Sequence, residues 1–306
     1  MADKAHILID EKLEEMEKRL SAIYSRASKE IGKEWKKYLK ESGKEIKDLQ
    51  DKYDLAKKGG DKDEIRKTGK ALGQAKRERT IKNKRFKALS ERTAMEISKV
   101  NETALAYING ELPEVYVTGY NALADAVDGV GGYAFNLLDA NTVKNLALAD
   151  ESLLPYKKLD PAKDIPWNMK KINAEVLQGI LQGESMDKIA NRIGRVQQMN
   201  ENASIRTART IVTGAENKGR MDSYERATKD GIILKKYWLA TAGKRTRDWH
   251  AQAGNDYTES KAIDVEKPFI VDGEEMMFPG DASSASGHNL YNCRCSMAAV
   301  VKGFRK

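Results

Sequence analysis

Apolar side chains recur at intervals of three and four residues through the first part of the chain, which is the spacing of one face of an α-helix. The series runs through Leu13, Met16, Leu20, Ile23, Ala27, Ile31, Trp35 and Tyr38. Gly59 and Gly60 interrupt it, and Asp61 with Glu64 resembles a capping box that begins another helix. A sparser apolar stripe then continues for several turns. These patterns predict that residues 1–109 form a long, coiled-coil-like helical hairpin.

Shorter helical patterns follow, and over residues 110–200 they predict a helical bundle. The last pair, around a turn at Gly183, has the outline of a DNA-reading helix-turn-helix, but few basic residues occupy its second helix, and the bundle is favoured. A further helix is expected to begin near Asn202 and to stop at Gly231. Its polar residues include Arg206, Arg209, Glu216, Asn217 and Arg220. Their spacing places several of them on one face.

After Gly231 the pattern changes to short runs typical of β-strands. The segment "IILKKYWLA" alternates, Asp272-Gly273 between two apolar stretches predicts a hairpin, and "CRCSMAAVV" is a further strand candidate. Residues 201–306 are therefore expected to form a small α+β domain. The predicted fold class is α+β and mostly helical, with a long N-terminal helical hairpin and a helical bundle followed by this small C-terminal domain.

Composition narrows the class of protein. The 306 residues are 40% hydrophobic and 33% charged, which permits a sizeable core and favours long exposed helices. There is no apolar run of eighteen residues, and the first thirty carry charge throughout, so neither a membrane span nor a signal peptide is expected. Two cysteines give no framework of secreted disulfides, which agrees with a soluble protein of a reducing compartment.

The net charge of +8 is unevenly distributed. Residues 51–100 contain 16 basic and 8 acidic side chains, whereas residues 101–150 contain 1 and 7. The densest basic stretch supplies the candidate contacts to DNA phosphates: Lys76, Arg77, Arg79, Lys82, Lys84, Arg85 and Lys87. Docking on an acidic protein surface, or a solvated helix face that keeps the arm soluble, remain the alternative interpretations.

Both cysteines lie close together near the C-terminus, as Cys293 and Cys295. In an extended strand their side chains would share one face, and a disulfide between them would be strained. Two small buried apolar side chains are the default interpretation. The alternative is a tetrahedral zinc site that also recruits His250 and His288, although Cys-x-Cys is not the spacing of common zinc modules.

Several motifs between Ser204 and Ala299 occur in an order that resembles a known family. They are "RTARTIVTGAENKGRMDSY", "KKYWLATAGKRTRDWH", "FPGD" and "NLYNCRC". The order is similar to that of the phage head-morphogenesis proteins, the minor head proteins similar to the F protein of phage Mu. Some members of that family carry an appended toxin domain.

The resemblance implies a minor structural protein of a tailed-phage head, associated with the portal and the procapsid interior. It would assist head assembly, and DNA packaging or delivery is a further role that the resemblance leaves open. The implied partners are the portal protein, the major capsid or scaffolding protein and, without sequence preference, double-stranded DNA, with no membrane. The protein would be found in the head interior of the virion, and in the host cytoplasm during assembly.

The polar residues of these motifs are expected to form a structural cluster rather than a catalytic site, because no serine elbow, paired carboxylates or His-Glu-x-x-His pattern accompanies the histidines. Buried polar pairing of the arginines with Asp281 or nearby asparagines is expected to fix a small domain. The cluster comprises Trp238, Arg245, Arg247, His250, Asp281, Asn292, Cys293, Arg294 and Cys295. No enzyme activity and no cofactor are expected. A metal-dependent nuclease and a non-specific DNA-binding protein are the alternatives.

Overall fold

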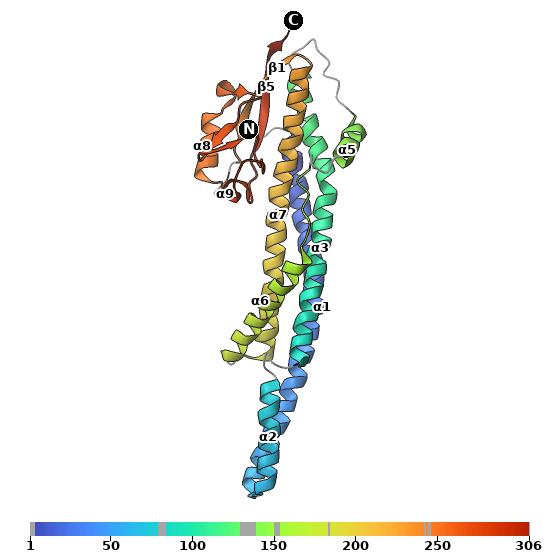
Figure 1. Ribbon diagram of the computed structural model, residues 1–306, viewed down its shortest axis with the longest axis vertical. Helices are drawn as coiled ribbons and strands as arrows, with labels where there is room; N and C mark the ends of the chain where they lie inside the picture. The colour runs from blue at the N-terminus through green and yellow to red at the C-terminus, as the bar shows by residue number, and fades with distance from the viewer. Residues whose placement is uncertain are drawn as a thin grey trace. The chain divides into compact units, whose positions relative to one another are not determined.

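The computed structural model describes residues 4–78, 84–128, 139–149, 154–182, 184–241, 243 and 246–305 (Figure 1). The helices are α1 (Lys4–Gly59), α2 (Lys62–Glu78), α3 (Lys84–Asn121), α4 (Leu123–Asp128), α5 (Ala140–Ala149), α6 (Pro161–Leu181), α7 (Met186–Lys229), α8 (Asp248–Asp256), the 3₁₀-helix η2 (Glu259–Lys261) and α9 (Gly287–Leu290). The strands are β1 (Ile232–Leu239), β2 (Ile263–Asp264), β3 (Phe269–Val271), β4 (Glu274–Met276) and β5 (Ser296–Phe304). The predicted class, α+β and mostly helical, is confirmed.

The chain divides into two compact units whose segments alternate along the sequence. Unit 1 comprises Met1–Arg19, Leu105–Lys157 and Ser204–Lys306, and unit 2 comprises Leu20–Ala104 and Lys158–Ala203. Helices α1, α3 and α7 each supply residues to both units. The domain boundaries expected from the sequence, at residues 109 and 200, stay a prediction. None of the helices in the described ranges has both the length and the apolar character needed to cross a bilayer.

The break between α1 and α2 follows the sequence signal for it. Gly60 adopts a φ of 72°, a left-handed conformation that glycine reaches without a steric penalty. The carboxylate of Asp61 then accepts hydrogen bonds from the backbone N–H groups of Asp63 (3.0 Å) and Glu64 (3.1 Å). Asp61 thereby satisfies two donors that a helix N-terminus leaves without intrahelical partners.

The core of unit 2 forms around Trp35, which is fully buried on the predicted apolar stripe of α1. Its ring packs edge-on against Phe86 at 5.7 Å, and its indole N–H donates to Thr93 at 2.9 Å. Side chains of α6 and α7 complete the cluster, among them Val176 and Ile193. The apolar seam of α1 is thus buried inside this unit at Ile31, Trp35 and Leu39.

One basic residue of the predicted second helix, Arg192, is buried in contacts between α6 and α7 instead of being presented to DNA. Arg192 of α7 is 7% exposed, and its guanidinium binds the carboxylates of Glu184 (2.5 and 2.8 Å) and Glu175 (3.2 Å). It also donates to the side chain of Gln182 at 2.6 Å. This arginine therefore ties the two helices together, as expected for a bundle.

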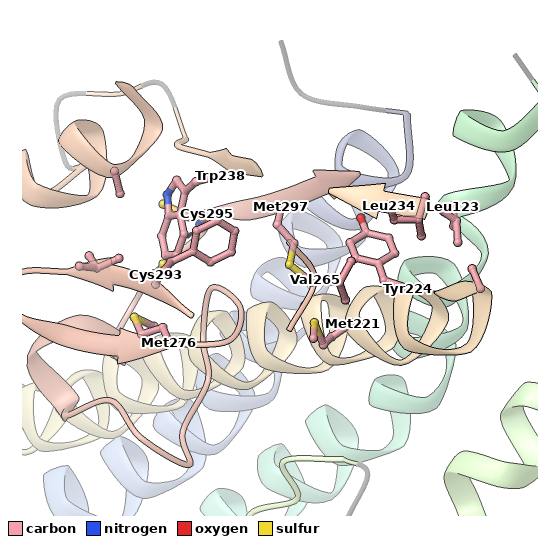
Figure 2. Packing of buried hydrophobic residues seen from close by; sticks show 14 of the residues in the cluster. Leu123, Met221, Tyr224, Leu234, Trp238, Val265, Met276, Cys293, Cys295 and Met297 are labelled. Carbon is pink, nitrogen blue, oxygen red and sulfur yellow. Dashed lines mark hydrogen bonds between the residues drawn. The ribbon is translucent and has the colours of Figure 1, made fainter. Parts of the chain in front are cut away.

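The three-stranded sheet of unit 1 has the strand order β2-β1-β5 with antiparallel pairing. Alternate side chains of β1 are buried, and Figure 2 shows Leu234 and Trp238 of this strand among the buried residues, with Met221 and Tyr224 of α7. The predicted hairpin is present, because Asp272 (φ 49°) and Gly273 (φ 78°) turn the chain between β3 and β4. Positive φ at both central residues is the geometry of a type I′ turn.

The strand predicted to begin at Cys293 begins three residues later, and this part of the prediction is wrong. Asn292 adopts a φ of 60°, and the backbone N–H of Cys295 points to the sulfur of Cys293 (3.4 Å) rather than to a neighbouring strand. Pairing with β1 starts only at Ser296, opposite Leu239. Both cysteines therefore lie in a tight irregular segment directly before β5.

Helices α3 and α7 approach each other closely inside unit 1. A Cβ atom at Gly119 would lie 2.2 Å from the carbonyl oxygen of Glu216, and one at Gly219 would lie 2.3 Å from that of Tyr116. Each helix thus contributes a glycine whose missing side chain leaves room for the backbone of the other helix. The phenol of Tyr116 also donates to Asp222 at 2.7 Å.

Candidate thiol–imidazole site

Three buried side chains of unit 1 bring their nitrogen and sulfur atoms together. Nδ1 of His250, on α8, lies 3.5 Å from Sγ of Cys293 and 3.5 Å from Sγ of Cys295. The three atoms all lie within 4.8 Å of one another. His250 is 1% exposed, and the two cysteines are 3% and 2% exposed (Figure 2 shows the cysteines close to Trp238). The fold brings these side chains together, because His250 lies on α8 and both cysteines lie in the segment before β5.

Helix α7 holds the cysteine segment through one of its faces. The hydroxyl of Thr213 donates to the carbonyl of Cys293 (2.6 Å), and the side-chain amide of Asn217 donates to the carbonyl of Cys295 (3.1 Å). The hydroxyl of Thr210 accepts from the backbone N–H of Asn292 (2.9 Å). Positions 210, 213 and 217 are three and four residues apart, so they lie on one helical face. The two threonines were missed as site residues, although they lie within the first quoted motif.

The tautomer of His250 follows from its contact with Asn289. The amide nitrogen of Asn289 donates to the carbonyl of Val271 (3.2 Å) and to the carboxylate of Glu274 (2.8 Å). Its oxygen therefore faces Nε2 of His250 (3.2 Å) and accepts from the indole N–H of Trp249 (2.8 Å). Because an amide oxygen only accepts, Nε2 carries a proton. Nδ1 is then the atom that can accept a proton from a thiol, or bind a metal ion together with the sulfurs. Asn289 was also missed.

The two thiols influence each other's ionisation. The hydrogen bond between them holds the pKa of Cys295 well below its usual range and raises the pKa of Cys293 well above it, while burial disfavours both thiolates. The hydrogen bond to His250 also lowers the pKa of Cys295. Ionisation of Cys295 therefore opposes ionisation of Cys293, and a nearby cation would reduce that opposition.

The structure places His288 apart from this group. Its Nε2 lies 2.7 Å from the carboxylate of Asp272, and its ring stacks on Trp249 with a centroid distance of 4.4 Å. Half of its side chain is exposed. Of the four residues considered for zinc, the fold thus assembles three, His250, Cys293 and Cys295.

The other residues of the predicted polar cluster have partners that the sequence did not indicate. Arg294 binds the carboxylate of Asp10 at 2.8 and 3.2 Å, and Arg247 donates to the carbonyl of Tyr291. Trp238 packs edge-on against His250 at 5.7 Å. The expected pairing of the arginines with Asp281 is not among these contacts. Arg245 lies outside the described residues.

Asp281 instead organises the loop after β4. Its carboxylate accepts from the backbone N–H groups of Met277 (3.0 Å) and Ser283 (3.0 Å). It also accepts from the hydroxyls of Ser283 and Ser284. These contacts fix the Pro-Gly-Asp turn without reaching the cysteines. Asn292 of the predicted cluster accepts from Arg209 at 3.1 Å.

A cavity of about 240 Å³ adjoins the thiol–imidazole group. His250 and both cysteines form part of its wall, and the guanidinium-bearing residues Arg209, Arg247 and Arg294 line it as well. Two of these arginines bind acidic residues of α1, Arg209 with Glu17 (2.6 and 2.7 Å) and Arg294 with Asp10. The site therefore combines soft donor atoms with a cavity that is large enough for water and has three arginines in its wall.

The first helix also contributes a buried charge pair. Nδ1 of His6 lies 3.0 Å from the carboxylate of Glu216, which is fully buried and also binds Arg220 (3.2 Å) and the hydroxyl of Ser296 (2.7 Å). Burial would raise the pKa of Glu216, but the hydrogen bond from His6 and the charge of Arg220 outweigh it and hold that pKa below its usual value. Sequence reasoning did not single out His6, Asp10 or Glu17.

The region that contains this site is also the region that matches a known family. Residues 170–298 match the family model described as "Phage Mu protein F like protein". This region is similar to that family. The resemblance predicted from the motifs between Ser204 and Ala299 is confirmed.

Two curated proteins are similar to the chain. The minor head protein GP7 of Bacillus phage SPP1 is 25% identical over 297 residues, which cover 95% of this chain and 87% of GP7. An NAD(+)–arginine ADP-ribosyltransferase, EFV of Enterococcus faecalis (strain ATCC 700802 / V583), is 30% identical over 134 residues. That match covers 44% of this chain and about a quarter (26%) of the transferase. No solved structure matches the chain. The chain therefore resembles a phage minor head protein over nearly its full length.

Proposed function

We propose that this chain is a minor structural protein of a tailed-phage head, located in the head interior near the portal, where it assists assembly. The similarity to minor head protein GP7 over 95% of the chain carries the proposal, together with the Mu F-like match over residues 170–298. The proposed partners are the portal protein and the major capsid or scaffolding protein, met in the host cytoplasm during assembly. A contribution to DNA packaging or delivery is part of the same proposal.

The packing of the Mu F-like region supports a structural role for its motif residues. His250 is 1% exposed and contacts Asn289, and Asn217 is fully buried and joins α7 to the cysteine segment and β5. Buried polar side chains that have protein partners help to hold their domain together. Loss of one of them should therefore act through folding.

A magnesium-dependent nuclease is less compatible with the donor atoms of the site. Mg²⁺ prefers carboxylate, carbonyl and water oxygens, whereas His250, Cys293 and Cys295 offer one nitrogen and two sulfurs. The activity in the name of the transferase belongs to a protein of which the match covers about a quarter. We therefore assign no enzymatic step to this chain.

His250→Ala and Arg294→Ala should lower the Tm of the protein and its incorporation into heads in parallel. Removing one partner of a buried hydrogen-bonded group costs about 1–3 kcal/mol, and His250 is such a group. Mass spectrometry of density-purified heads from a phage that carries each variant measures the ratio of this chain to the major capsid protein. His288→Ala, at an exposed position, is the control and should be incorporated normally.

Two results would contradict the proposal. Absence of the native chain from purified heads would exclude a structural role in the particle. A stable His250→Ala protein that assembles normally into heads of low infectivity would instead place the enzyme alternative first, because a catalytic residue can be lost without loss of folding.

Weak DNA binding without sequence preference is expected from the basic stretch around the start of α3. Lys76 and Arg77 lie near the end of α2, and Arg79 and Lys82 lie outside the described residues. Lys84, Arg85 and Lys87 are exposed, while Phe86 between them is buried in unit 2. Three exposed cations within one turn of α3 can neutralise phosphates and release counterions.

Changing Lys84, Arg85 and Lys87 together to Glu should abolish the gel shift at low salt and flatten its dependence on salt concentration, since each lost phosphate contact reduces the slope by about 0.9. The matched control changes three other exposed lysines, Lys229, Lys261 and Lys302, to Glu and alters the net charge equally. If both triple variants lose binding to the same extent, net charge rather than this stretch attracts DNA.

A further inference from the structure

We propose that Nδ1 of His250 and the thiolates of Cys293 and Cys295 bind one zinc ion, with a water from the adjoining cavity as the fourth ligand. The default interpretation of the sequence, two structural cysteines without metal, did not include the position of His250. The structure supplies that position, and three properties of the site support the inference.

The first property is the spacing of the donor atoms. With Zn–S bonds of about 2.3 Å and Zn–N bonds of about 2.0–2.1 Å, the N···S edge of a tetrahedral site is about 3.5–3.6 Å. Both sulfurs lie 3.5 Å from Nδ1 of His250. A single nitrogen lone pair accepts one good S–H hydrogen bond, so it does not by itself explain two sulfurs at the same distance. One metal ion would satisfy all three atoms at once.

The second property is the set of groups that orients the donors. Asn289 accepts from Nε2 of His250 and so directs the Nδ1 lone pair toward the sulfurs. The backbone N–H of Cys295 points to Sγ of Cys293 (3.4 Å), and the backbone N–H of Thr241 points to the sulfur of Cys295. Metal-binding histidines commonly donate their other N–H in this way, and such contacts fix the ligand geometry.

The third property is the balance of charge and space. A Zn²⁺ ion with two thiolates is neutral overall, which suits a buried group next to three arginines. One imidazole and two thiolates are soft donors that favour zinc over magnesium or calcium. In the ranges that the structure describes, His250, Cys293 and Cys295 form the group, with no fourth histidine, cysteine or carboxylate in it, and the cavity provides room for water. Bound zinc would join α8 to the segment before β5.

The test uses the full chain, purified under reducing conditions without added metal and stripped with a chelator. Dialysis against zinc followed by elemental analysis should give about one equivalent, and zinc should raise the Tm by several degrees. Addition of Co²⁺ should produce the intense visible bands of a tetrahedral site and a near-ultraviolet thiolate-to-metal band. Zinc should also protect both cysteines from a thiol reagent.

Two variants separate this site from adventitious binding. Cys295→Ser should lose the stoichiometric metal and the thiolate band, whereas His288→Ala should retain both, because His288 lies outside the group. The proposal is overturned if the folded native chain binds well under one equivalent of zinc and its thiols react equally with and without the metal. Retention of one equivalent by Cys295→Ser overturns it as well. The native-chain measurement decides the matter if Cys295→Ser does not fold.

Discussion

Gly219→Ala is expected to destabilise unit 1 by about 3 kcal/mol or more, which is a large part of the stability of a typical domain. The added Cβ would lie 2.3 Å from the carbonyl oxygen of Tyr116 and 2.9 Å from the backbone nitrogen of Tyr120. Both are backbone atoms of α3, so a rotamer change cannot relieve the overlap. Gly119→Ala should have a similar effect, because its Cβ would lie 2.2 Å from the carbonyl oxygen of Glu216.

Gly110→Ala is the control for this prediction. Gly110 lies in α3, as Gly119 does. Nothing lies within 4 Å of a Cβ at Gly110, so the substitution should stabilise the helix by about 0.5–1 kcal/mol. Chemical denaturation followed by near-ultraviolet circular dichroism measures both changes. An unchanged midpoint for Gly219→Ala would mean that the two helices do not approach as closely as the structure has them.

Glu216→Gln is expected to destabilise the protein by about 3–5 kcal/mol near pH 6, because it removes the anion that faces His6 and Arg220 in a buried site. Glutamine preserves the shape of the side chain, so the loss reports on charge rather than on packing. Glu275→Gln, at an exposed position of β4, is the matched control and should change stability by less than about 0.5 kcal/mol. An equal effect of the two substitutions would contradict the assignment of a buried charge cluster.

The same pair sets a pH dependence. Burial would lower the pKa of His6, but the hydrogen bond and the charge of Glu216 raise it above its usual value of 6.5. The contribution of His6 to stability is therefore fully present below pH 6.5 and is lost as the pH rises through the raised pKa. The contribution of Glu216, whose pKa is lowered from 4.5, is present above pH 4.5 and is lost as the pH falls through the lowered value. Both act together between about pH 4.5 and 6.5.

His6→Gln should accordingly remove part of the loss of stability that the native protein undergoes between pH 6 and pH 9. Denaturation midpoints at several pH values measure this, with His288→Gln as the control, since His288 is exposed and lies beside Asp272. Parallel pH profiles for the native protein and His6→Gln would show that His6 does not contribute through its charge.

The local pattern of the sequence was enough to predict the long helices, the β3–β4 hairpin and the resemblance to the family. The helix expected to begin near Asn202 is instead part of α7, which begins at Met186. Trp35 and its neighbours on α1 follow a helical repeat that can be recognised without knowing what they pack against. Asp272-Gly273 favours a type I′ turn because both residues readily adopt a positive φ. The motifs from Ser204 onward resemble the Mu F-like proteins because they keep their order, and the family match bears this out. The helical repeat and the turn depend on residues that are near one another in the chain, and the order of the motifs is a property of the sequence itself.

The composition of the polar sites was decided only by the tertiary structure. Arg294 binds Asp10, Glu216 binds His6, and Cys293 and Cys295 meet His250 rather than His288. Each contact joins segments that are tens to hundreds of residues apart, and periodicity says which face a side chain occupies but not what faces it. The start of β5 after the cysteines was likewise decided by hydrogen bonds from α7, a distant helix whose threonines hold the segment out of the strand.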